Sequence, residues 1–181
     1  MCVAFRACEL DHAAVKRVVE AHYDDVLAYC RRHTQTLDEA QDATQEVFLR
    51  FVRTADRYRD AGKPLAYLLT IARNVCIDVD RARVRACVEL PAEDVLAAPE
   101  TSGESGGVYG EAVGEADALR HALASLPVDM REVLELRFDQ ELKLVDIARV
   151  LGISRFAARR RVDAALAALR IQMDVGGEES W

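Results

Sequence analysis

Apolar residues recur at three- and four-residue spacing along most of the chain, which predicts helices rather than strands. A first helix is expected from a cap at Asp11 to about Arg32. Its apolar stripe is Val15, Val18, Val19, His22, Tyr23, Val26, Leu27 and Cys30. A second helix begins at a capping box formed by Thr36 and Glu39. Its inward face is predicted to hold Ala40, Ala43, Val47, Phe48 and Phe51.

A third helical pattern starts at Pro64, which suits the first position of a helix, and continues to about Arg85. Its outward face is predicted to carry Tyr67, Arg73, Asn74, Asp78, Arg81, Arg83 and Arg85. Arginines for phosphate, a ring for stacking and an amide for base edges suit single-stranded nucleic acid. An ordinary solvated face of an amphipathic helix would carry the same arginines, so this segment alone leaves both interpretations open.

Helical periodicity returns after residue 116 and predicts a unit of four helices. A helix marked by Leu119, Ala122, Leu123 and Leu126 ends at Pro127. Asp129 is a candidate cap for the next helix. In that helix, Met130, Val133, Leu134 and Phe138 are predicted to face inward.

The stretch from Leu142 to Leu169 predicts a helix-turn-helix. Gly152 stands where the first helix must stop, and Ser154 is a candidate cap for the second helix. Small Ala148 lets the two helices cross closely. From Ser154 to Arg170 there are five arginines and one acid, Asp163. These arginines predict a recognition helix in a DNA major groove, although a helical hairpin with a solvated arginine face would show the same pattern.

Residues 86–115 differ from their flanks. They contain no basic residue and seven acids, Glu89, Glu93, Asp94, Glu100, Glu104, Glu111 and Glu115, among prolines and glycines. A flexible acidic linker is therefore expected, which serves either as a spacer or as a competitor of DNA phosphates. We favour the spacer because the acids are spread out. The predicted fold is all-α, with an N-terminal domain at 1–85, a helix-turn-helix domain at 116–173 and a tail at 174–181.

Composition narrows the functional class. No apolar run approaches the roughly 20 residues of a membrane span, and no signal peptide is recognisable, so a cytoplasmic protein is expected. The five cysteines include no CxxC pair, which is typical of reduced thiols. His22, Cys30 and His33 are spaced so that they could hold a metal, but Cys30 continues an apolar stripe, which favours a buried structural thiol. No phosphate loop, HExxH or nucleophile constellation points to an enzyme.

Four segments together resemble one family, the bacterial RNA polymerase sigma factors of the sigma-70 family and extracytoplasmic-function type. They are DEAQDATQEVFLRF at 38–51, PLAYLLTIARNVCID at 64–78, LASLPVDMREVLELRF at 123–138 and LVDIARVLGIS at 144–154. The resemblance implies a subunit that selects promoters and supplies no catalytic residue, metal or cofactor. Its implied partners are core RNA polymerase, promoter DNA as duplex and as melted non-template strand, and an anti-sigma protein.

The resemblance also implies three sets of site residues. The polymerase-binding set is Asp38, Asp42, Gln45, Glu46 and Leu49. The set expected at the minus-ten element is Arg57, Tyr58, Arg59, Tyr67, Arg73, Asn74, Arg81 and Arg85. The set expected at the minus-thirty-five element is Ser154, Arg155, Phe156, Arg159, Arg160 and Arg161.

Two departures from the family pattern stand out. Tyr67 occupies a position usually held by tryptophan, and Phe156, Ala157 and Ala158 replace a small Gly-Thr-Val run. Phe156 is expected either to contact a thymine methyl or a sugar, or to pack on the neighbouring helix. The alternative function is a helix-turn-helix regulator that never joins polymerase. The motif at 38–51 favours a polymerase subunit, because a plain repressor has no use for it.

Overall fold

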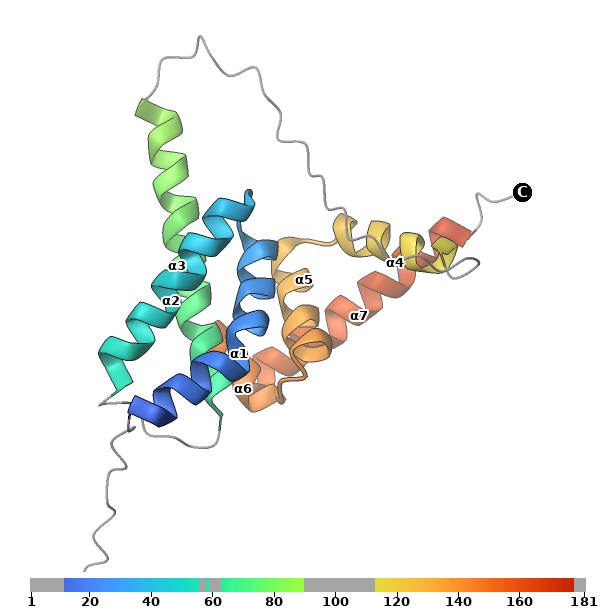
Figure 1. The fold of residues 1–181 in the computed structure, drawn as a ribbon. Coiled ribbons are helices and arrows are strands. Elements are labelled where there is room, and N and C mark those ends of the chain that lie inside the picture. Colours follow the sequence, from blue (N-terminus) through green and yellow to red (C-terminus); the bar gives the residue numbers. More distant parts are fainter. Residues whose placement is uncertain (1–11, 56–57, 59–62, 90–112, 178–181) are drawn as a thin grey trace, which may run out of the picture. The chain divides into compact units, whose positions relative to one another are not determined.

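The computed structural model describes residues 12–55, 58, 63–89 and 113–177, and every regular element within these ranges is a helix (Figure 1). The helices form two compact units, one within Met1–Thr101 and the other within Ser102–Trp181. The division falls inside the segment expected to be a linker. The all-helical fold predicted from the sequence is confirmed.

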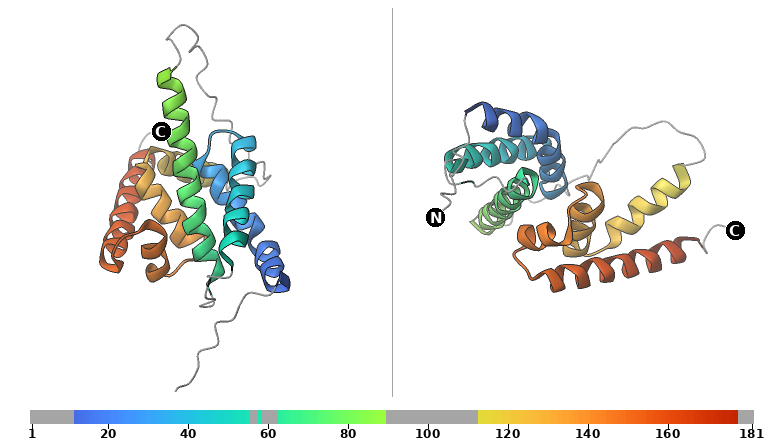
Figure 2. Two further views of the ribbon diagram at one scale, coloured as in Figure 1. Left: turned by 90° about the vertical axis from the view of Figure 1, so that its left-hand side faces the viewer. Right: turned by 90° about the horizontal axis from the view of Figure 1, so that it is seen from below.

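The first unit contains α1 (His12–His33), α2 (Leu37–Thr54) and α3 (Pro64–Glu89), each packed against the other two. Its largest fully buried side chains are Val26, Tyr29, Cys30, Thr44, Val47, Phe51, Leu68 and Leu69. The C-terminal end of α3 extends past α1 and α2 (Figures 1 and 2). Helices α2 and α3 thus bury one face in a common apolar core and leave the opposite face exposed.

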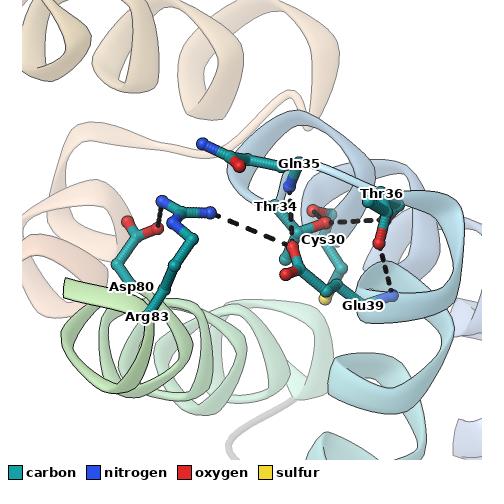
Figure 3. Close-up of polar contacts among 7 residues, drawn as sticks. All are labelled: Cys30, Thr34, Gln35, Thr36, Glu39, Asp80 and Arg83. Atoms are coloured by element: carbon teal, nitrogen blue, oxygen red, sulfur yellow. Dashed lines mark hydrogen bonds and ion pairs between the residues drawn. The ribbon is translucent and has the colours of Figure 1, made fainter. Parts of the chain in front are cut away.

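Polar contacts fix the junction between α1 and α2 against α3 (Figure 3). Thr36 is the N-cap of α2, and its hydroxyl accepts the amide N–H of Glu39 at 3.1 Å. The Glu39 carboxylate accepts the amide N–H of Gln35 at 2.9 Å, which confirms the capping box with its return bond shifted by one residue. Arg83 of α3 pairs with Asp80 at 2.5 Å and lies 4.0 Å from Glu39. The prediction that Arg83 faces outward was therefore wrong, because this acid at the start of α2 holds it half-buried.

The apolar stripe of α1 is wider than the sequence pattern indicated. Tyr29, outside the predicted stripe, is fully buried and stacks on His33 with 4.2 Å between ring centroids. Tyr23, within the predicted stripe, remains 41% exposed and stacks on Phe48. Since α1 packs on both α2 and α3, its buried face turns toward Tyr29. The expected cap at Asp11 lies outside the described residues.

The third helix continues to Glu89, four residues beyond the predicted end at Arg85. Residues 86–88 are alanine, cysteine and valine, which a helix tolerates, and the next helix-breaking residue is Pro91. The loss of basic residues after Arg85 therefore does not by itself end the helix.

The second unit contains α4 (Val113–Ser125), α5 (Val128–Leu134), a π-helical turn η2 (Glu135–Asp139), α6 (Leu144–Leu151) and α7 (Arg155–Gly177). Helix α7 packs against α4, α5 and α6. The core of this unit is centred on five fully buried residues, Val133, Leu136, Ile147, Ala158 and Ala165. Its first helix, α4, begins at Val113 rather than at 116, and α7 includes residues 174–177, which were predicted to belong to a tail.

The predicted cap of α5 was wrong. The cap is Pro127, which makes no side-chain cap bond, and Asp129 lies in the first turn. The connection is instead secured by Arg131, whose guanidinium donates to the carbonyls of Leu123, Ala124 and Leu126 at 2.9–3.1 Å. A cation thus satisfies carbonyls left without intrahelical partners at the end of α4.

Phe138, predicted to face the core, is 59% exposed, while Leu136 is fully buried. The π turn explains the change, because the amide N–H of Gln140 donates to the Glu135 carbonyl at 3.0 Å across five residues. A widened turn shifts the phase of the residues that follow it, so a count based on 3.6 residues per turn fails here.

Candidate partner and nucleic-acid interfaces

An exposed stripe runs along α2, opposite its buried face. Asp38, Asp42, Gln45 and Leu49 follow each other at spacings of four, three and four, and all are exposed. Val52 continues the stripe three residues later, and Leu49 and Val52 are 51% and 52% exposed. We call these five residues the α2 stripe. An apolar pair at one end and acids at the other give it the features of a protein-docking surface.

Glu46, predicted to belong to the same set, lies at the edge of the α2 stripe and already has a partner. The Arg50 guanidinium donates to its carboxylate at 2.7 Å and approaches Asp78 of α3 at 3.5 Å. The hydrogen bond with Glu46 raises the pKa of Arg50, because it favours the charged form of the guanidinium. Because these side chains are partly exposed, the pairs stabilise the unit only slightly, by at most about 1 kcal/mol.

The outer face of α3 brings together part of the set expected at the minus-ten element. Asn74, Arg81 and Arg85 are exposed and lie on one face with Asp78, which approaches Arg81 at 4.0 Å. Arg73 lies beside this face and is half-buried. We call Asn74, Arg81 and Arg85 the α3 face. Arg57 and Arg59 lie outside the described residues.

Tyr58 and Tyr67 belong to an aromatic cluster between α2 and α3. Their ring centroids are 4.8 Å apart, and both rings pack edge-on to Phe51. Tyr58 is only 9% exposed, so its predicted position at a nucleic-acid surface was wrong. Tyr67 is half-buried, with its hydroxyl 3.2 Å from that of Thr54. Phe51, at the end of α2, must be covered, and the two tyrosines provide the apolar area.

The turn between α6 and α7 has the predicted chemistry. Gly152 adopts φ +65°, the left-handed region that glycine occupies at least cost. The amide N–H of Ile153 donates back to the Ala148 carbonyl at 2.9 Å. The Ser154 hydroxyl accepts the amide N–H of Ala157 at 3.1 Å, which confirms it as the cap of α7. The start of α7 is therefore fixed by a backbone hydrogen bond before the turn ends and by a side-chain cap after it.

The set expected at the minus-thirty-five element lies together on the exposed start of α7. Ala158, Val162 and Ala165 are buried, and the six predicted residues, Ser154, Arg155, Phe156, Arg159, Arg160 and Arg161, are all exposed. Arg159 is 3.7 Å from Asp163, one turn further on. We call Arg155, Phe156, Arg159, Arg160 and Arg161 the α7 face. Its four guanidinium groups can bind phosphates and base edges.

Sequence reasoning missed Val52 and Arg50. The spacing of the α2 stripe predicts Val52, since it lies three residues after Leu49. Arg50 follows Glu46 by four residues, a spacing at which opposite charges meet on a helix, but its contact with Asp78 depends on the packing of α2 against α3. Cys30 is fully buried, and the described part of the chain contains no group of three or more potential metal ligands.

Comparisons with known proteins agree on one family. The chain matches the family descriptions "Sigma-70 region 2" over residues 18–86 and "Sigma-70, region 4" over residues 122–170. It is 32% identical over 176 residues to the ECF RNA polymerase sigma factor SigD of Mycobacterium tuberculosis, covering 93% of this chain and 81% of the relative. It is 30% identical to the ECF RNA polymerase sigma factor ShbA of Streptomyces griseus, covering 91% and 90%.

The fold has a solved counterpart. The sigma factor RpoE, crystallised in complex with the anti-sigma factor NepR from Bartonella quintana, superposes with a TM-score of 0.67 at 21% identity. The superposition covers 88% of this chain and 96% of that one. This likeness establishes the helical fold of the chain.

Proposed function

The chain belongs to the extracytoplasmic-function sigma factors of RNA polymerase, and we propose that its three exposed faces divide the work of promoter selection among them. As a member of this family it is a promoter-specificity subunit, which binds core polymerase and directs initiation at particular promoters. The proposal assigns polymerase binding to the α2 stripe, the minus-ten element to the α3 face and the minus-thirty-five element to the α7 face.

The observation that carries the proposal is the exposed α2 stripe beside the α3 face in one small unit. Leu49 and Val52 leave an adjacent pair of apolar side chains in water, which a protein partner can cover. Glu46, Asp38 and Asp42 place negative charge there, which nucleic acid would repel. A protein partner on α2 and DNA on α3 account for both features, and this separates the chain from a regulator that acts without polymerase.

On the α3 face, Arg81 and Arg85 would bind phosphates of the melted strand and Asn74 would read a base edge. Arg73, Tyr67 and the predicted Arg57 and Arg59 complete this set in the proposal. Tyr67 would offer the edge of its ring while Tyr58 supports it from the interior. The role proposed for Tyr58 is thus structural.

Catalysis is assigned to the polymerase, as sigma factors in general are not enzymes. We place the chain in the cytoplasm, where the polymerase works. No helix among the described residues is long and apolar enough to cross a membrane.

We further propose control by an anti-sigma protein that covers exposed apolar area on α2. RpoE, which shares the fold, was crystallised with such a protein. A tagged chain purified from unstressed cells is expected to bring down one dedicated inhibitor. Repeated recovery of polymerase without any inhibitor would contradict this part of the proposal.

A selection experiment tests the division of work. Holoenzyme assembled from the full chain and core polymerase is offered a randomised DNA library, and the bound sequences are determined. Two separated sequence blocks are expected. Asn74→Ala should relax the downstream block only, and Arg160→Ala the upstream block only. If both variants changed the same block, or if no sequence were enriched, the assignment of faces would be wrong.

A further inference from the structure

Phe156 is an unusual residue for the surface it occupies. It is the second residue of α7 and is 72% exposed, and no other large apolar side chain in the described ranges is more exposed. The alternative that it packs on the neighbouring helix is therefore not what the structure shows. An aromatic ring that is exposed to this degree offers a large apolar surface to a ligand that packs against it.

Its surroundings indicate the chemistry of that ligand. Phe156 shares the exposed side of α7 with Arg159 and Arg160, three and four residues later, and Arg155 precedes it. The nearest acid on this side, Asp163, is paired with Arg159. An apolar group ringed by guanidinium groups suits a ligand that offers an apolar spot between negative charges. Duplex DNA does so in its major groove, where the 5-methyl group of thymine lies between phosphates.

The position in the helix fits the same ligand. Residues at the start of a recognition helix contact base edges, and side chains of a helix lean toward its N-terminus. The bonds of Ser154 to the amides of Ala157 and Ala158 fix this first turn. Phe156 is thus held in place without being buried.

We propose that Phe156 is a specificity-determining residue whose ring contacts the 5-methyl group of a thymine in the upstream promoter element. This inference rests on the proposed role of the α7 face as the reader of duplex DNA. It predicts that the upstream element contains at least one thymine whose methyl group, and not merely its base pairing, contributes to affinity.

Deoxyuridine provides the test, since it differs from thymidine only by the methyl group. Each thymine of the selected upstream element is replaced in turn by deoxyuridine, and holoenzyme affinity is measured. Burial of one methyl group corresponds to roughly a fourfold change in affinity. With the unaltered chain, one replacement is expected to weaken binding by about this factor. With Phe156→Ala, the same replacement should have no effect, because the two changes remove the same contact.

Ile171→Ala is the matched control. Ile171 is also an exposed apolar residue of α7, at 61%, but it lies fifteen residues beyond Phe156, about 22 Å along the helix. This variant should keep the response of the unaltered chain to deoxyuridine. Both side chains are exposed, so neither substitution should unfold the protein.

Three results would overturn the inference. The first is an equal response of the unaltered chain and Phe156→Ala to every deoxyuridine. The second is a loss of affinity with Phe156→Ala that is uniform across DNA sequences, which would indicate a sugar contact. The third is loss of holoenzyme formation, which would place a protein partner on Phe156. Failure of the proposed function itself would look different, because the holoenzyme would then enrich no sequence from the library.

Discussion

Gly152 holds the turn between α6 and α7 in the left-handed backbone region. A Cβ added at this position would meet nothing within 4 Å, so any cost of substitution comes from the backbone alone. Gly152→Ala should lower the free energy of unfolding by about 1 kcal/mol, and Gly152→Asn by less, because asparagine tolerates this conformation. Denaturant unfolding of the full chain, followed by circular dichroism, measures the difference. Equal stability of the alanine variant would show that the turn relaxes.

Arg159 is the residue of the α7 face for which base contact and phosphate contact are easiest to separate. Arg159→Ala is expected to cost about 1–3 kcal/mol of discrimination at one promoter position and to leave polymerase binding intact. Competition binding with promoters changed one base pair at a time provides the measurement. Asp163→Ala serves as the control for its 3.7 Å ion pair, since an exposed pair of this kind stabilises the helix little. A uniform loss over all sequences would assign Arg159 to phosphate.

The α2 stripe can be tested by one substitution and a control on the same helix. Leu49→Asp should abolish co-elution with core polymerase, because it places a charge at the apolar end of the stripe. Leu49 is 51% exposed, so the folded state should be kept. Leu37→Asp changes an equally exposed leucine of α2 away from the stripe and should leave co-elution unchanged.

Co-elution of folded Leu49→Asp at the level of the unaltered chain would remove the stripe from the polymerase interface. Glu46→Lys is expected to lose polymerase as well. Its bond to Arg50 makes Leu49 the cleaner test, because reversal of Glu46 also disturbs the contact between α2 and α3.

The helices and turns differ in how much of their structure could be predicted from the local sequence. The start of α2 and the turn at Gly152 rest on local chemistry, namely a side chain that bonds to a nearby amide and a residue that tolerates positive φ. Both were predicted correctly. The burial of Tyr29 depends on where α2 and α3 lie around α1. The exposure of Phe138 depends on a π turn, which the residue types at these positions do not predict. These could not be derived from periodicity alone.

The same distinction applies to the candidate interfaces. Spacing along a helix predicted the exposed positions of Asp42, Gln45 and Leu49 and the crowding of arginines at the start of α7. It failed for Tyr58, because this ring packs in the interior against Phe51 of α2 and Tyr67 of α3. It also failed for Arg83, whose partner Glu39 is distant in sequence. Contacts within one helix are thus predictable, and contacts between helices require the packing.

For the whole molecule, the charge between the two units offers a separate prediction. Residues 90–112, which lie outside the described ranges, contain five acids, Glu93, Asp94, Glu100, Glu104 and Glu111, and no base. If they only keep a spacer solvated, replacing all five by glutamine should leave the affinity of the free chain for DNA unchanged. We expect this result. Tighter binding at low salt, where screening is weakest, would instead establish competition with DNA phosphates.

This chain is expected to give core RNA polymerase its choice of promoter. Run-off transcription with purified core polymerase, the full chain and a template carrying the selected sequence measures this choice. We predict a transcript of defined length only when the chain is present, and its loss with Leu49→Asp despite intact folding. A chain that binds the template but leaves the transcripts of core polymerase unchanged would contradict this expectation and indicate a regulator that acts without joining the enzyme.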